Sequence, residues 1–223
     1  MHKFYGQRSQ LNIDFFSTLK GALTLLRNPE KTESVYDIED GLRNTQATQA
    51  AIEFVQKDPA VASLIAERYQ PPLLKLEELA QLPPNSLGYT YARYIRDAGF
   101  DPNFYRPIDV VDDASYVLLR MRQTHDIWHI VAGFKTDVAG ELGLKAFELA
   151  QTRRTMAAVL VCGGLLKTLF NTPDQLDEVL DRLASGYRTG MNAEPLLAQK
   201  WEEHWERSLT EWREFLNIPQ RES

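Results

Sequence analysis

The chain has 223 residues, with 25 Lys and Arg against 31 Asp and Glu, and 43% of its residues are hydrophobic, as in an ordinary globular protein with a full core. A net charge of −6 without a basic tract argues against nucleic-acid binding, because proteins neutralise phosphates with clustered Lys and Arg. The single cysteine, Cys162, excludes a disulfide framework and a zinc site of paired cysteines. Any metal must therefore be held by His and carboxylate side chains.

The start of the chain, MHKFYGQRSQ, does not resemble a signal peptide, because it lacks an apolar stretch and a small-residue cleavage site. The longest uncharged apolar run, residues 156–166, is far shorter than the ~20 residues with which a helix crosses a bilayer. We therefore expect a cytoplasmic location, no membrane-spanning helix, and residues 1–10 as a flexible N-terminus.

Apolar periodicity and capping residues predict helices along the chain. The first covers residues 11–27, where apolar side chains recur every three or four positions on one face. The later elements are expected over residues 45–57, 60–69, 86–100 and 114–134, a long apolar stretch over 137–170, then 174–188 and about 195–216. Asp58 and Asp112 precede two of these helices as expected of caps, and Gly99 is the expected end of another.

No stretch alternates with period two, and the sequence contains no hairpin signal, internal repeat or glycine-rich linker. These features predict one all-α domain over residues 1–223, a multi-helix bundle. Small residues within 156–166 predict a narrow apolar channel for a lipid tail, although a close helix crossing explains them as well. Cys162, in the same run, is expected to be a buried small hydrophobe.

Two segments are candidates for membrane contact. Near the C-terminus, Trp201, Trp205 and Trp212 form a stripe at helical spacing, and core or dimer packing is the favoured interpretation because the opposite surface is rich in glutamate, which anionic lipids repel. The better membrane candidate is the helix over residues 11–27, although such helices more often dock on their own core.

The chemically informative segment is HDIWH, residues 125–129, which holds two of only four histidines and has helical periodicity. Residues three and four apart share a helix face, so His125, Asp126 and His129 can converge on one point. Two imidazoles and a carboxylate suit Zn²⁺, Fe²⁺ or Mn²⁺ better than Mg²⁺ or Ca²⁺. The alternative is a surface pair of Asp126 and His129 beside a half-buried His125.

Glu141 is the candidate fourth ligand, on one condition. In an unbroken helix the twelve-residue separation from His129 would be ~18 Å, so the helix must break between them. Gly133 can adopt a left-handed C-terminal conformation, and Thr136 or Asp137 can cap a new helix. Glu141 would then lie in the first turns of the next helix, folded back toward the histidines.

Two better-known motifs fit poorly. Metalloproteases need Glu directly after the first His, and this chain has the shorter Asp126 there. Phosphohydrolases of the His-Asp type need a further upstream histidine, and the one available, His2, lies at the terminus.

The pattern His-Asp-x-x-His, followed after eleven residues by Glu, resembles the metal motif of the coenzyme Q (ubiquinone) biosynthesis protein four family. Upstream, LPPNSLGYTYARYIRDAGFDP and RPIDVVDDASYVLLRMRQTHD are similar to segments of that family. Downstream, GELGLKAFELAQT and KWEEHWERSLTEWREFLNIP are similar as well. The resemblance covers most of residues 11–219.

This resemblance implies an all-helical protein, peripheral on membranes, that handles polyprenyl-tailed quinone precursors and takes part in oxidative removal of the C1 carboxylate from the prenylated ring. Carried over residue by residue, it makes His125, Asp126, His129 and Glu141 the metal ligands and the catalytic centre. The implied cofactor is a divalent metal, zinc in first place, with iron, manganese and magnesium as alternatives.

The expected partners are a polyprenyl-tailed lipid, the cytoplasmic face of a membrane, other quinone-biosynthesis enzymes and a second copy in a homodimer, without nucleic acid. The absence of an Arg-rich transit peptide favours a bacterial member. Met121, Arg122, Leu144 and Lys145, each about one turn from a ligand, are expected contacts of the head group or lipid. For the two cations, exposed ion pairs are the alternative.

Two functions of different class stay open. One is a metal-dependent decarboxylase or hydroxylating lyase that acts on a prenylated hydroxybenzoate. The other is a non-catalytic isoprenoid-lipid-binding scaffold that presents substrate to other enzymes and has a structural metal. An open coordination position favours the enzyme, and a closed four-ligand zinc favours the scaffold.

Overall fold

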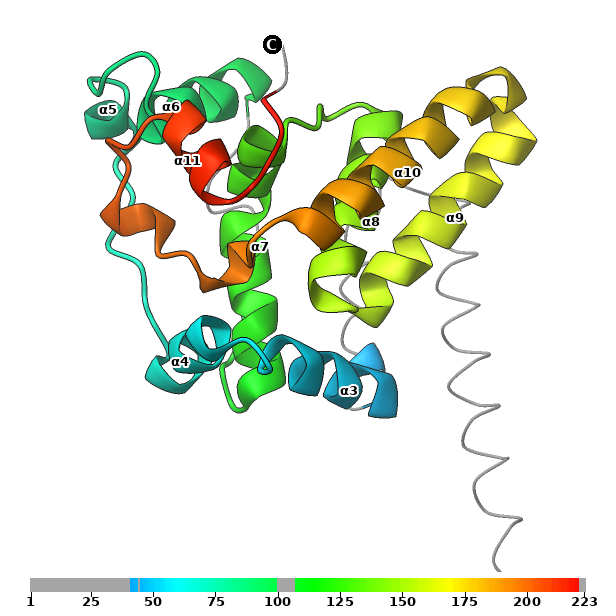
Figure 1. Cartoon of the computed structure of the whole chain (residues 1–223), viewed down its shortest axis with the longest axis horizontal. Helices are drawn as coiled ribbons and strands as arrows, with labels where there is room; N and C mark the ends of the chain where they lie inside the picture. Colours follow the sequence, from blue (N-terminus) through cyan, green and yellow to red (C-terminus); the bar gives the residue numbers. More distant parts are fainter. Residues whose placement is uncertain (1–40, 44, 100–106, 221–223) are drawn as a thin grey trace, which may run out of the picture.

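The computed structural model describes residues 41–43, 45–99 and 107–220, most of which are helical (Figure 1). The helices are α3 (Gln46–Val55), α4 (Pro59–Glu67), α5 (Leu76–Leu79), α6 (Leu87–Ala98), α7 (Asp113–Ala132), α8 (Val138–Thr152), α9 (Thr155–Asn171), α10 (Leu176–Asn192) and α11 (Leu209–Phe215), with 3-10 turns η1 (Pro173–Gln175), η2 (Leu196–Ala198) and η3 (Trp201–Glu203). Across these ranges the β-type pairing is limited to one bridge between Ser86 and Ser208. The all-α prediction is confirmed. The helix predicted over 11–27 and the N-terminus 1–10 lie outside the described residues.

Side-chain caps begin helices where the sequence predicts them. Thr45 accepts a hydrogen bond from an amide of the first turn of α3. Asp58 does the same for two amides of α4, and Pro59 occupies the first helical position, where its missing N–H removes no bond. Gly99 ends α6 with φ +66°, a left-handed conformation that costs glycine little. Local chemistry thus places these ends correctly.

The predicted break after the HDIWH segment is also confirmed. Gly133 ends α7 with φ +71°, and its N–H bonds the carbonyl of His129. The Asp137 carboxylate accepts the N–H of Gly140 at 2.7 Å and so caps α8. Glu141 is therefore in the first turn of α8, as the metal hypothesis requires.

The long apolar stretch over 137–170 is two helices. Arg153 lies between α8 and α9 with φ +54°, so the chain reverses there without a glycine. On α9, a Cβ on Gly164 would overlap the side chain of Leu142 on α8. The two helices therefore cross closely at this point, as the alternative interpretation of the small residues in 156–166 expected. The apolar channel stays a prediction. The expected burial of Cys162 is wrong, because that side chain lies on the exposed side of α9.

The single C-terminal element predicted over 195–216 is wrong. It divides into η2, η3 and the short α11, with non-helical backbone between them. The reason is tertiary: the carbonyls of Trp205 and Arg207 accept the N–H groups of Gly88 and Leu87 at 2.8 and 2.9 Å, so this segment satisfies the amides that begin α6. Trp201 and Trp212 are buried with ring centroids 4.6 Å apart, which confirms core packing for these two members of the stripe.

Helices α8, α9 and α10 form a layer beside α7 (Figure 1). Glycines bring α10 very close to α8: a Cβ on Gly186 would overlap the carbonyl group of Gly143, and one on Gly190 would lie 2.7 Å from the carbonyl oxygen of Phe147. This backbone-to-backbone approach holds α8, and with it Glu141, in position.

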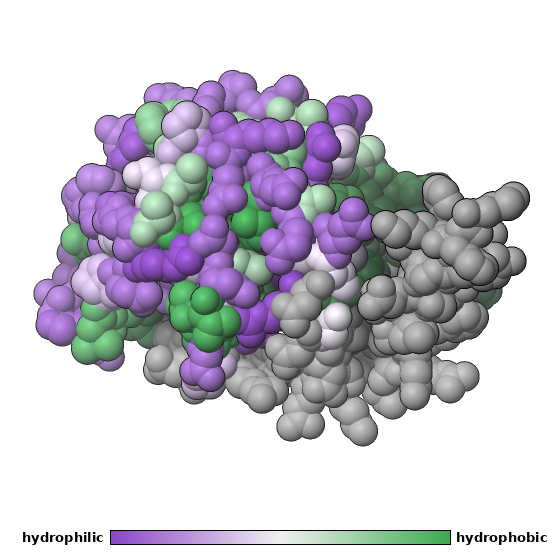
Figure 2. Space-filling model, turned by 90° about the horizontal axis from the view of Figure 1, so that it is seen from below, coloured by the Kyte–Doolittle hydropathy of each residue, from purple (hydrophilic) through white to green (hydrophobic). Residues whose placement is uncertain are grey.

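The main core joins α3, α4, α6, α7, α8 and the C-terminal turns around Trp128, Trp201 and Trp212. On the face seen in Figure 2, hydrophilic side chains predominate among the described residues, with smaller apolar patches between them. No helix in the described part of the chain is long and apolar enough to cross a membrane.

Candidate metal centre

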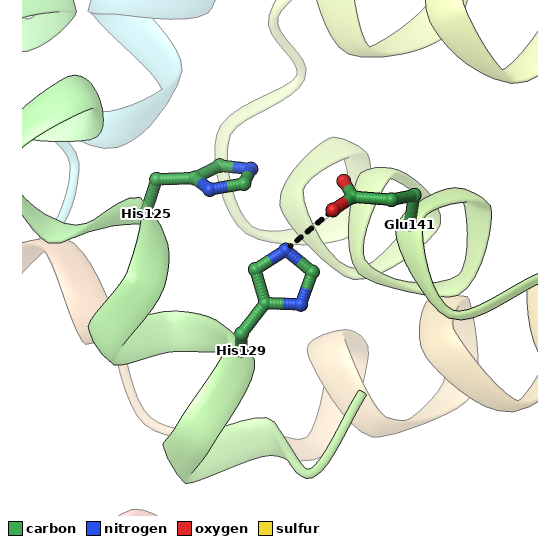
Figure 3. Close-up of side chains that lie close together, drawn as sticks. All are labelled: His125, His129 and Glu141. Carbon is green, nitrogen blue, oxygen red and sulfur yellow. Dashed lines mark ion pairs between the residues drawn. The ribbon is translucent and has the colours of Figure 1, made fainter. Parts of the chain in front are cut away.

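Three side chains from two helices meet at one point. His125 and His129 lie one turn apart on α7, and Glu141 faces them from α8 (Figure 3). One donor atom from each lies within 4.8 Å of the other two. Nε2 of His129 is 3.1 Å from Oε1 of Glu141, and the two imidazole centroids are 4.8 Å apart. The helix break at Gly133 thus brings together three of the four predicted ligands.

The surroundings of His129 fit a metal ligand. Its side chain is 1% exposed, and Nδ1 lies 3.0 Å from the backbone carbonyl of Phe134 in the turn between α7 and α8. If Nδ1–H donates to that carbonyl, the lone pair of Nε2 faces the centre. Nε2 is buried and has no hydrogen-bond partner within the described ranges, although a carboxylate oxygen lies near it. With that tautomer, a nitrogen lone pair faces a carboxylate oxygen 3.1 Å away, an arrangement that a divalent cation between the two atoms would stabilise, so the residues fit a bound divalent metal.

His125 and Glu141 both have perturbed pKa values. Burial lowers the pKa of His125, and the positive charge of Lys145 lowers it further, which favours the neutral, ligating imidazole. For Glu141, burial opposes ionisation, but the contact with His129 and the positive charge of Lys145 favour the carboxylate, and the pKa of Glu141 is lowered. The Glu141 side chain is therefore ionised at neutral pH, the form that binds a cation.

The structure does not bring Asp126 into the three-residue group. Its Oδ1 lies 3.5 Å from Nδ1 of His125, on the neighbouring position of α7. A carboxylate beside the second nitrogen of a ligating histidine commonly orients the ring and raises its basicity. This placement suits an orienting partner of His125, and direct ligation by Asp126 stays a prediction.

The four expected head-group residues divide into two kinds. Met121 and Leu144 are 4% and 1% exposed and belong to the main core, which accounts for them as packing residues. Arg122 is half-buried on α7. Lys145 forms an ion pair with Glu148 at 2.8 Å. The pair is largely buried, whereas the alternative interpretation of the sequence expected an exposed ion pair at Lys145.

Comparison with known proteins decides the family. A family model described as Coenzyme Q (ubiquinone) biosynthesis protein Coq4 matches residues 13–222. The chain belongs to this family. The resemblance read from the HDIWH segment and its flanking sequences is thereby confirmed.

Similar proteins include two fungal ones described as ubiquinone biosynthesis protein COQ4, mitochondrial. The chain is 35% identical to that of Eremothecium gossypii over 66% of its own length and 46% of the relative, and 36% identical to that of Uncinocarpus reesii over 65% and 52%. The match thus spans about half the length of these relatives. The structure is also similar to a crystal structure of a Nostoc punctiforme protein whose description names ubiquinone biosynthesis. The two superpose with a TM-score of 0.83 at 37% sequence identity, over 91% of this chain and 97% of that one.

Proposed function

We propose that this member of the Coq4 family is a metal-dependent enzyme that binds a polyprenyl-tailed aromatic acid and removes the ring carboxylate oxidatively. The observation that carries the proposal is the number of donors: within the described residues, two histidines and one carboxylate converge, and Asp126 lies outside this group. Three protein ligands leave coordination positions open, as catalytic sites do, whereas a structural zinc site is closed by four.

The reaction replaces the carboxylate of the ring by a hydroxyl. The bond between the ring carbon and the carboxylate breaks, CO₂ leaves, and one oxygen atom is added, with O₂ as oxidant and a two-electron donor that reduces its second atom to water. A divalent metal at the site would stabilise developing charge as a Lewis acid, or activate oxygen if it is iron. Zinc is the metal that the sequence favours, and iron is the alternative that suits the oxidative step.

In this site the protein's own residues bind and orient. His125, His129 and Glu141 would hold the metal, and the Phe134 carbonyl would fix the tautomer of His129 by accepting its Nδ1–H. Asp126 would orient His125 in the same way. We propose in addition that the protein binds the lipid tail, contacts a membrane surface, forms a homodimer and associates with other quinone-biosynthesis enzymes, as the resemblance to the family implies.

The test is turnover of a prenylated 4-hydroxybenzoate with O₂, a reductant and protein of known metal content. The wild type should release CO₂ and the hydroxylated ring, and Glu141→Ala should lose both the metal and the activity. Glu178→Ala is the control, because this glutamate is exposed on α10 and is not one of the three converging side chains. A metal-loaded wild type that binds the lipid without turnover would refute the enzyme and support the scaffold.

A further inference from the structure

A second cluster of charges lies on α8 and at the start of α9, and the metal group does not use it. Nζ of Lys145 is 2.8 Å from one oxygen of Glu148, and a guanidinium nitrogen of Arg154 is 3.1 Å from the other. Glu148 is 3% exposed, and the side chains of both cations are about 15% exposed. A carboxylate is thus held between two cations inside the protein.

The cluster adjoins the metal group. Glu141, Lys145 and Glu148 are spaced by four and three residues on α8, so they share one face of that helix. The charge of Lys145 lowers the pKa values of both His125 and Glu141, so the cluster lies within electrostatic range of the ligands.

The charge balance of the cluster favours an anion. Two cations against one carboxylate leave one excess positive charge next to a site expected to hold a divalent metal. The bond to Glu148 uses one of the three N–H donors of the Lys145 ammonium. The pKa of Glu148 is lowered to about 2: burial opposes its ionisation, and the charges of Lys145 and Arg154 outweigh that effect. The carboxylate that holds Lys145 is therefore charged throughout the physiological range.

We propose that Lys145 binds the carboxylate of the aromatic acid beside the metal, and that Glu148 and Arg154 are positioning residues that hold its ammonium there. The proposal rests on the proposed function and names the group that distinguishes the acid from the ring after carboxylate loss. A preorganised cation of this kind discriminates by charge, because a neutral ring gains no charge-assisted hydrogen bond from it.

The experiment compares binding of two probes to zinc-loaded protein by calorimetry: a geranylated 4-hydroxybenzoate and the corresponding geranylated phenol without the carboxylate. The wild type should prefer the acid, and Lys145→Met should weaken binding of the acid about 10- to 100-fold while binding of the phenol changes little. Lys145→Arg, which keeps the charge, should restore part of the preference. Glu148→Gln should also weaken binding of the acid, at unchanged zinc content.

Lys75→Met is the matched control. Lys75 makes the same kind of pair with Glu78, three residues on, at 2.7 Å, but on the surface at α5. Its loss should leave binding of both probes as in the wild type. If Lys145→Met binds the acid as tightly as the wild type does, the inference is refuted while the proposed function stands. If neither probe binds to the metal-loaded wild type, both are refuted.

Discussion

Gly186 on α10 faces Gly143 on α8 with no space for a side chain, and Gly186→Ala tests this contact. The added Cβ would overlap the Gly143 carbonyl group, lying 2.8 Å from its carbon, and would lie 3.2 Å from its Cα, so the helices must part by about 1 Å to reach ordinary carbon contacts. Overpacking of this kind costs roughly 1–3 kcal/mol or more, and the gain in helix propensity is at most about 1 kcal/mol.

We expect Gly186→Ala to lower the free energy of unfolding by about 2 kcal/mol and the Tm by roughly 5 °C for a chain of this size. The matched control is Gly163→Ala on α9, where a Cβ would meet nothing within 4 Å among the residues that the structure describes. That change should instead raise stability by about 0.5–1 kcal/mol. Urea and thermal unfolding, followed by circular dichroism, measure both variants. Equal or higher stability of Gly186→Ala would refute the close approach of α8 and α10.

Three further predictions follow from particular contacts. His129→Ala should lose the bound metal in elemental analysis, whereas Asp126→Asn should retain a metal held about 10-fold more weakly, and equal loss in both would make Asp126 a ligand. The pKa of Glu148 is lowered from 4.5 to about 2, so its charged form stabilises the fold above pH ~4.5 by on the order of 3 kcal/mol, and this contribution is lost as the pH falls toward 2. Between pH 5 and pH 3, the free energy of unfolding in urea should therefore fall less in Glu148→Gln than in the wild type. Arg120 is 1% exposed and pairs with the buried Glu202 at 2.9 Å, so Arg120→Met should cost about 3–5 kcal/mol in denaturant titration, and a loss below 1 kcal/mol would contradict the buried pair.

Capping and helix periodicity were readable from the sequence because they depend on neighbours along the chain. Asp58, Gly99 and Asp137 begin or end their helices as predicted, since each acts on backbone groups within a few residues. The same local logic required a break at Gly133, and that break is what brings Glu141 to the histidines.

Contacts between distant segments were not readable in this way. Residues 195–216 look helical, but the carbonyls of Trp205 and Arg207 accept the amides that begin α6, more than a hundred residues earlier. The buried Glu148 pairs with Arg154, which lies beyond the turn between α8 and α9. Arg153 forms that turn in a left-handed conformation, and because it is not a glycine, nothing in the sequence indicated the turn. Helical spacing placed Asp126 with the histidines, yet its carboxylate lies beside His125, outside the three-residue group. Spacing along a helix indicates which side chains share a face, whereas the packing of a second helix determines which of them meet a partner.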